Sequence, residues 1–179
     1  MRIISGSHKG RIINPPAGLK LRPTTDKARE GLFNILNNIV EYSELQVLDL
    51  FAGTGSISYE FASRGAELVH AVEINSRHAS FIINTASKLD LSCIKVFRAD
   101  IRRYLEKTLD TYKLIFADPP YKLPWMEDIP ALVFSSDCLE PGGLFILEHP
   151  AAYNFTANEY FSEHRKYGSV NFSFFRIPL

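Results

Sequence analysis

The chain has 179 residues, with 20 basic and 20 acidic residues, a formal net charge of zero and 46% hydrophobic residues. This length suits one domain with a substantial core and is too short for a second large recognition domain. The two cysteines do not make a disulfide framework, and neither they nor the five histidines have the spacing of a metal site. No segment has the long apolar run of a membrane helix or a signal peptide, so we expect a cytoplasmic protein.

Basic residues gather near the amino terminus. The first 29 residues contain seven Lys or Arg and one acid, whereas the rest of the chain carries 13 basic and 19 acidic residues. Residues 2–4 and 11–13 flank a polar turn and predict a hairpin, so residues 1–24 are expected to form a basic hairpin extension that faces phosphates. The alternative is a solvated charged surface without a ligand. The candidate phosphate contacts are Arg2, Lys9, Arg11, Lys20 and Arg22.

The next segment predicts a helix, because Thr24 or Thr25 can cap it and apolar residues recur at helical spacing from Ala28 to Ile39. Apolar and helical segments then alternate, which is typical of a parallel sheet with helices on both faces. The expected strands are 47–51, 68–73, 94–98, 113–117 and 143–148, and the expected helices are 56–64, 76–89, 101–109 and 129–135. Residues 163–167 and 170–177 predict a final antiparallel hairpin.

The first strand of this series contains Asp49 and ends in a glycine turn at residues 51–55. Glycines let a ligand approach the backbone closely, and open parallel sheets bind ligands beyond the carboxyl ends of their strands. Glu73 ends the next strand, twenty residues after Gly53, where an acid can bind ribose hydroxyls. Together these residues predict a pocket for a nucleoside-bearing cofactor.

A second motif, Asp118-Pro119-Pro120-Tyr121, directly follows the apolar segment 113–117. Proline has a fixed φ and no backbone N–H, so neighbouring carbonyl groups remain acceptors for an incoming donor. An acid, a rigid turn and an aromatic ring at the edge of a sheet can hold a planar amine. The tetrapeptide is therefore predicted to be the acceptor site.

With these motifs the chain resembles the class I S-adenosylmethionine-dependent methyltransferases. More narrowly, it is similar to the bacterial enzymes that methylate the exocyclic N2 of a guanine in 16S ribosomal RNA. This narrower resemblance rests on residues 1–6, 9–11, 22–36 and Glu148-His149-Pro150, in addition to the two motifs, and covers nearly the whole chain. Gly31 departs from the family pattern and is expected to weaken the first helix by roughly 1 kcal/mol.

The resemblance implies a Rossmann-like α/β fold, with a seven-stranded mixed sheet that is mostly parallel, and a methyltransferase domain over residues 25–179. It implies S-adenosylmethionine as cofactor and 16S ribosomal RNA as partner, free or within an assembled small-subunit particle, for a monomeric enzyme. The implied cofactor site consists of Asp49, Phe51, Ala52, Gly53, Thr54 and Gly55 at the methionine end, Glu73 at the ribose and Asp100 at the adenine, together with Ile74 and Ile101. A helix N-cap is an alternative or additional role for Asp100.

The expected chemistry depends on alignment more than on a perturbed acid or base. Asp118 is expected to accept one N–H of the guanine N2, and a carbonyl near Pro119 or Pro120 the other. Tyr121 is expected to stack on the base, which has left its own stack to enter the pocket. Trp125 either contacts RNA or packs the loop, and Glu148 has no assigned role.

Four alternative functions share part of this pattern. A dinucleotide-dependent oxidoreductase would need a third glycine where Ser58 stands. A DNA adenine-N6 methyltransferase shares the acceptor motif but has a DNA-reading domain for which this chain has no room. A glutamine-N5 methyltransferase shares the motif too, and only the basic amino terminus argues against it. A non-catalytic RNA-binding relative would not need an intact Asp118 and glycine turn.

Overall fold

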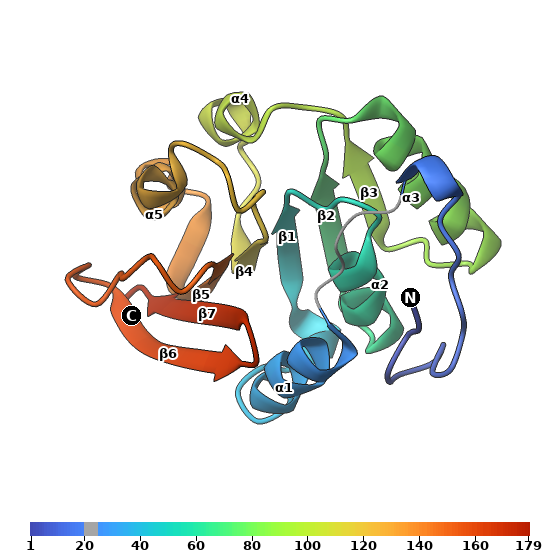
Figure 1. The fold of residues 1–179 in the computed structure, drawn as a ribbon, viewed down its shortest axis with the longest axis horizontal. Helices are drawn as coiled ribbons and strands as arrows, with labels where there is room; N and C mark the ends of the chain where they lie inside the picture. Colours follow the sequence, from blue (N-terminus) through green and yellow to red (C-terminus); the bar gives the residue numbers. More distant parts are fainter. Residues whose placement is uncertain (20–24) are drawn as a thin grey trace.

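The computed structural model describes residues 1–19 and 25–179 and shows one sheet between two layers of helices (Figure 1). The strands are β1 (Gln46–Leu50), β2 (Leu68–Val72), β3 (Ile94–Phe97), β4 (Tyr112–Ala117), β5 (Leu139–His149), β6 (Phe161–Tyr167) and β7 (Val170–Arg176). The helices are α1 (Asp26–Leu36), α2 (Ser56–Ser63), α3 (Ser76–Lys88), α4 (Ile101–Lys107) and α5 (Ile129–Ser135). Within the described ranges, none of the helices has the length and apolar character to span a membrane.

The sheet has seven strands in the order β3-β2-β1-β4-β5-β7-β6. Strands β1 to β5 all run parallel to one another. Strand β7 is antiparallel to both of its neighbours, β5 and β6. The predicted mixed sheet with a C-terminal antiparallel hairpin is therefore confirmed.

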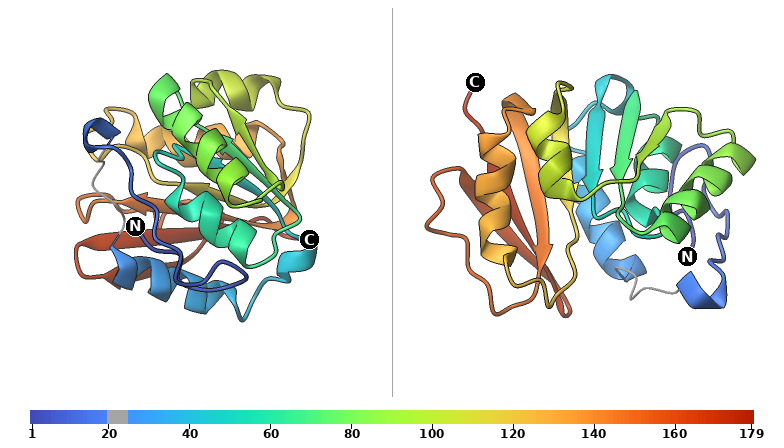
Figure 2. Two further views of the ribbon diagram at one scale, coloured as in Figure 1. Left: turned by 90° about the vertical axis from the view of Figure 1, so that its right-hand side faces the viewer. Right: turned by 90° about the horizontal axis from the view of Figure 1, so that it is seen from above.

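Side chains alternate along the strands between two cores, one on each face of the sheet. On β1, Val47 belongs to the first core, and Leu48 and Leu50 belong to the second. The first core is covered by α1, α2 and α3, and the second by α4 and α5 (Figure 2). Helices on both faces, as predicted, leave the carboxyl ends of the parallel strands as an open edge.

The predicted bounds of the strands and helices from residue 46 onward lie within two residues of the observed bounds, except at β5, which begins at Leu139 and not at residue 143. Tyr112 pairs with Leu139, and the pairing then shifts register before resuming at Leu114 and Leu144. The irregular part of the strand contains Pro141 and Gly142. The φ of Gly142 is 74°. A proline and a left-handed glycine are typical of a turn in sequence, and here they form a bulge within a strand.

The amino-terminal hairpin forms between the predicted segments, around an isolated bridge between Arg2 and Ile12. The Ile3 N–H donates to the Arg11 carbonyl at 3.0 Å, and the Ile13 N–H donates to the Met1 carbonyl at 2.9 Å. Other polar groups of the hairpin bond to α2. The Ile4 N–H donates to Glu60 at 2.5 Å, and the Ser63 hydroxyl donates to the Ser5 carbonyl at 2.6 Å. These bonds hold the hairpin against the helix on the first face of the sheet.

Gly31 has a packing role that its sequence context does not show. A Cβ at this position of α1 would lie 2.2 Å from Cε1 of Tyr167, at the end of β6. That separation is far below van der Waals contact, so α1 and β6 approach this closely only because residue 31 has no side chain.

Gly31→Ala is expected to destabilise the protein although it improves helix propensity. The gain of roughly 1 kcal/mol in the helix is smaller than the roughly 1–3 kcal/mol cost of overpacking against Tyr167. Urea unfolding of the single variants and of Gly31→Ala combined with Tyr167→Ala measures the coupling between the two sites. In the Tyr167→Ala background the same glycine substitution should stabilise the protein, and a destabilising effect in both backgrounds would contradict the contact.

Candidate active site

The two sequence motifs meet at the point where the strand order reverses. β1 pairs with β2 on one side and with β4 on the other, and ligands bind at such switch points in open α/β sheets. The glycine loop follows β1, and Asp118 follows β4. The Asp118 N–H lies 3.5 Å from the Leu50 carbonyl, which extends the pairing beyond the end of β4. The acceptor motif and the glycine loop are therefore neighbours.

The glycine loop has three residues with positive φ: Phe51 at 61°, Gly53 at 59° and Gly55 at 86°. For Phe51 this conformation costs about 1–2 kcal/mol, because its Cβ is crowded by the backbone. A Cβ at Gly55 would lie 2.7 Å from the Tyr59 ring. The Gly55 N–H donates to the Ala52 carbonyl at 2.8 Å, so the turn is closed before α2 begins. The loop thus turns sharply at the switch point, with Phe51 half-buried and residues 52–55 buried.

Asp49 lies behind this loop and is only 1% exposed. The hydroxyl of Ser58, itself fully buried on α2, donates a hydrogen bond to the Asp49 carboxyl group. Burial raises the pKa of Asp49 to about 7, and the bond from Ser58 opposes this shift. Ser58 was not among the predicted site residues. The sequence did hold one indication of this residue, because Ser58 stands where the dinucleotide-binding pattern has its third glycine.

Glu73 connects the glycine loop to the turn that follows β2. Its Oε2 accepts the Gly53 N–H at 2.7 Å, and its Oε1 accepts the Asn75 N–H at 2.7 Å. The residue is 7% exposed, and His78 Nδ1 lies 3.9 Å from Oε1. Two backbone donors, one on each oxygen, fix the position of this carboxylate. The residue predicted at the ribose thus also organises both loops.

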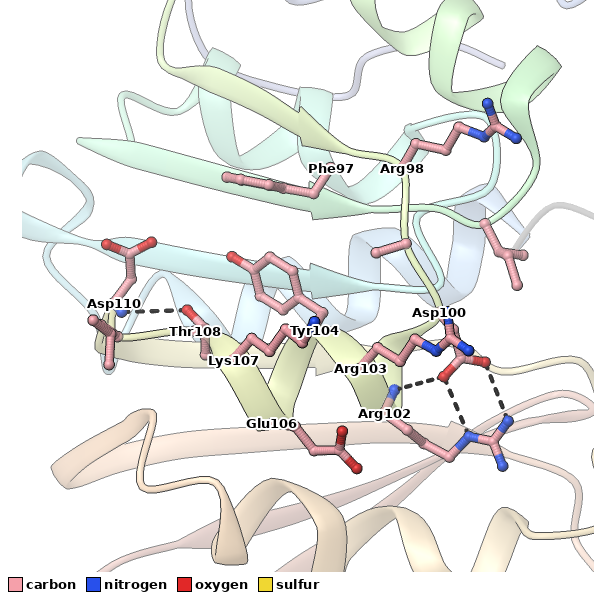
Figure 3. A pocket seen from close by; sticks show the side chains of 13 residues that line it. Phe97, Arg98, Asp100, Arg102, Arg103, Tyr104, Glu106, Lys107, Thr108 and Asp110 are labelled. Atoms are coloured by element: carbon pink, nitrogen blue, oxygen red, sulfur yellow. Dashed lines mark hydrogen bonds and ion pairs between the residues drawn. The ribbon is translucent and has the colours of Figure 1, made fainter.

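Asp100 is the N-cap of α4 and accepts the Arg102 N–H at 3.0 Å. The Arg102 guanidinium also contacts both carboxylate oxygens, at 3.2 and 3.3 Å, and this hydrogen bonding lowers the pKa of Asp100 (Figure 3). The same guanidinium lies 4.8 Å from the ring centre of Trp125, which lies 6.2 Å from the ring of Phe51. Trp125 thus packs between the glycine loop and α4, in line with the packing alternative.

An open cleft of about 1270 Å³ runs along α4 below the edge of β3 (Figure 3). Its lining includes Ile74 and Asp100 from the predicted cofactor set, together with Phe97 and Tyr104. Ile74 is 64% exposed and directly follows the buried Glu73. The side chain of Ile101 is 4% exposed and belongs to the second core, so it does not face the cleft.

The acceptor loop turns sharply after β4. The Pro120 carbonyl accepts the Leu123 N–H at 2.8 Å, which closes the turn. The Tyr121 hydroxyl donates to Glu148 Oε1 at 3.1 Å, and Glu148 is only 3% exposed at the end of β5. The aromatic ring of the motif is therefore tied to a buried carboxylate that the sequence analysis left without a role.

The basic candidates that the structure describes lie on the amino-terminal hairpin and not at the acceptor motif. Arg2, Lys9 and Arg11 are exposed, whereas Lys20 and Arg22 lie outside the described residues. The turn that contains Lys9 binds the carboxyl end of α2, where the Ser7 N–H donates to Ser63 at 2.7 Å. Because α2 has eight residues, this turn lies about 12 Å along the helix axis from the glycine loop.

Asp49→Asn should change how stability depends on pH. A carboxyl group whose pKa is raised on folding stabilises the protein below its unfolded pKa and loses that contribution as pH rises through the folded value, here about 7. From pH 5 to pH 8 the variant should therefore gain about 2 kcal/mol relative to the wild type. Urea unfolding at both pH values tests this, with the exposed Asp90→Asn as control. Parallel pH profiles for wild type and Asp49→Asn would contradict it.

The chain matches the family model "Conserved hypothetical protein 95" over residues 1–176. Ribosomal RNA small subunit methyltransferase D of Escherichia coli K12 is 30% identical, over 83% of this chain and 74% of that protein. The protein of the same name from Buchnera aphidicola subsp. Baizongia pistaciae is 32% identical, over 86% of this chain and 78% of that protein. The solved structure of yhhF from Escherichia coli has a TM-score of 0.86 at 27% identity and covers 99% of this chain and 98% of that one. The chain therefore belongs to the ribosomal RNA small subunit methyltransferase D family and has the class I methyltransferase fold.

Proposed function

We propose that this protein transfers a methyl group from S-adenosylmethionine to the exocyclic N2 of a guanine in 16S ribosomal RNA. One observation carries the proposal: in a member of this family, Asp118-Pro119-Pro120-Tyr121 lies beside the glycine loop at the switch point between β1 and β4. A cofactor site and an amine-binding acceptor site are thereby neighbours, as methyl transfer requires.

The residues at the carboxyl edge fit an adenosyl cofactor. The exposed Ile74 offers an apolar surface to the adenine, and Asp100 offers a carboxylate to its amino group. Glu73 would accept ribose hydroxyls while it retains its backbone donors, because a carboxylate can accept about four hydrogen bonds. Asp49 and residues 51–55 would hold the methionine end. When bound, the cofactor supplies a sulfonium methyl group, whose carbon–sulfur bond breaks as the new carbon–nitrogen bond forms.

The acceptor loop orients the amine. Asp118 accepts one N–H of the guanine N2 and stabilises the positive charge that develops on the nitrogen. The Pro120 carbonyl already closes the turn to Leu123, so the Pro119 carbonyl is assigned to the second N–H. Tyr121 stacks on the base, with its hydroxyl held by Glu148. The proton that N2 loses passes to Asp118 or to water.

Residues 1–24 are proposed as an RNA-facing extension of a methyltransferase domain that spans residues 25–179. Arg2, Lys9 and Arg11 lie along this extension, and a turn about 12 Å from the site would contact phosphates distant from the reacting base. We propose that the monomer acts on RNA within an assembled small-subunit particle or on the free RNA.

Glutamine-N5 methylation is the second candidate, because it uses the same acceptor motif. A Methanocaldococcus jannaschii protein named for this activity is 33% identical over 110 residues, which are 62% of this chain and 53% of that protein. The relatives named for ribosomal RNA match more of both chains, and the extension at residues 1–24 is basic. We therefore favour RNA.

Transfer of a labelled methyl group tests the proposal. The wild type is expected to label unmodified 30S particles or 16S RNA as N2-methylguanine, and Asp118→Ala should lower this rate by roughly 100-fold or more, because it removes both orientation and charge stabilisation. Adenine-rich duplex DNA and a release-factor protein serve as competing substrates, and nuclease digestion followed by chromatography identifies and maps the product.

Label in adenine or in glutamine would show that the proposed substrate is wrong, but it would not contradict the proposed active-site residues. Cofactor binding by the wild type, measured by calorimetry, without transfer to any of these acceptors would support the non-catalytic alternative.

Loss of the basic side chains should weaken RNA binding and its dependence on salt together. Each phosphate contact removed should lower the slope of log K against log salt by about 1. The slope is measured by filter binding for two variants. One is the triple variant Arg2→Ala, Lys9→Ala, Arg11→Ala, and the other is the double variant Lys20→Ala, Arg22→Ala. Lys166→Ala, at an exposed position of β6, is the matched control. If both variants have the same slope as the wild type, the proposal that residues 1–24 contact RNA phosphates is wrong.

A further inference from the structure

Asp118 has a carboxylate neighbour on the next strand. Ala117 of β4 pairs in parallel register with Leu147 of β5, so the following residues, Asp118 and Glu148, are adjacent on strands about 4.8 Å apart. The N–H contact from Asp118 to the Leu50 carbonyl shows that the strand direction continues through this residue. Two acidic side chains therefore occupy equivalent positions at the acceptor edge.

Both side chains also point to the same face of the sheet. Ala117 and Leu147 belong to the second core, so alternation directs the next side chain of each strand toward the first face. The cross-strand partner of Glu148 is Phe172, which belongs to the first core and confirms this orientation. Asp49 lies between Leu48 and Leu50 of the second core and has the same orientation.

Glu148 is built into the acceptor site and not placed on its surface. It is 3% exposed, and its Oε1 accepts the hydroxyl of Tyr121 from the acceptor motif. Burial of a carboxylate is costly unless its oxygens receive hydrogen bonds. A carboxylate has about four acceptor positions, so Glu148 can accept a hydrogen bond from a base while it accepts the Tyr121 hydroxyl.

The Watson–Crick edge of guanine has the donors that this pair of acids could bind. Its N1–H and N2 amino group are adjacent donors, whereas adenine has an amino donor beside an N1 lone pair. Ionised carboxylates can only accept hydrogen bonds, so two of them match the two adjacent donors of guanine. With adenine, a negatively charged carboxylate would face the N1 lone pair. A site built to bind one donor rejects an analogue that lacks it, because its polar group is then left unpaired.

We propose that Glu148 selects guanine by accepting its N1–H while Asp118 accepts one hydrogen of N2. The inference rests on the proposed function and deepens it, since it assigns base selection to a residue outside the Asp-Pro-Pro-Tyr motif. Tyr121 is then a positioning residue for Glu148 as well as a stacking platform.

The test replaces the mapped target guanine in 16S RNA with 2-aminopurine by splinted ligation. This base keeps the N2 amine but has a lone pair in place of the N1 proton. The wild type is expected to prefer guanine by at least about 100-fold in kcat/KM. Glu148→Gln can still accept the Tyr121 hydroxyl and places an amide donor opposite N1, so it should lower the rate on guanine and reduce the preference by at least about 10-fold.

Comparison of each variant with the wild type cancels the intrinsic reactivity of the two amines. Glu140→Gln, at the other end of β5, is the matched control and should leave both rates unchanged. Glu148→Asp retains the charge, so it should slow transfer and keep the preference for guanine within about threefold of the wild-type value. It also serves as the test if Glu148→Gln does not fold.

An unchanged preference in Glu148→Gln, or a collapsed preference in Glu148→Asp, would overturn the role of Glu148 and leave the proposed function in place. Failure of the wild type to methylate guanine, with label in another acceptor, would instead overturn the proposed function.

Discussion

The parallel pairing of β1 with β4 is the constraint on which the site depends. It places the glycine loop and the acceptor motif side by side, although they are more than sixty residues apart in the chain. Because the strands on either side of this pair connect in opposite directions, the two connections diverge at this point and leave a crevice at the carboxyl edge. The helices of both layers and the two cores serve to hold this pair of strands in register.

Buried carboxyl groups line this edge, and each has a specific donor. Asp49 accepts a serine hydroxyl, Glu73 two backbone N–H groups, and Glu148 a tyrosine hydroxyl. Burial raises the pKa of Asp49 although the Ser58 hydroxyl donates to its carboxyl group. An acidic edge with fixed acceptors suits ligands that present N–H and O–H groups, and an adenosyl cofactor and a guanine both do so.

The acceptor loop is also connected to the second layer of helices. Trp125 lies near Phe51 of the glycine loop and under the Arg102 guanidinium at the start of α4. Arg102 in turn contacts both oxygens of Asp100. A cation over an aromatic ring contributes roughly 0.5–1 kcal/mol at an exposed site, and this contact joins the loops after β1, β3 and β4. These contacts hold the three loops together at the carboxyl edge of the sheet.

Local sequence determined the strands, the helices and the two motifs, because apolar periodicity, prolines and glycines act over a few residues. The bulge of β5 was missed, since Pro141 and Gly142 are typical of a turn unless a neighbouring strand pairs across them. Only the tertiary structure decided which residues meet: the Ser58 hydroxyl bonds to Asp49, the Tyr167 ring lies against Gly31, and the pairing of Ala117 with Leu147 places the next residues, Asp118 and Glu148, on neighbouring strands. These contacts join positions on different elements, and strand order and register, which no local pattern specifies, determine which positions meet.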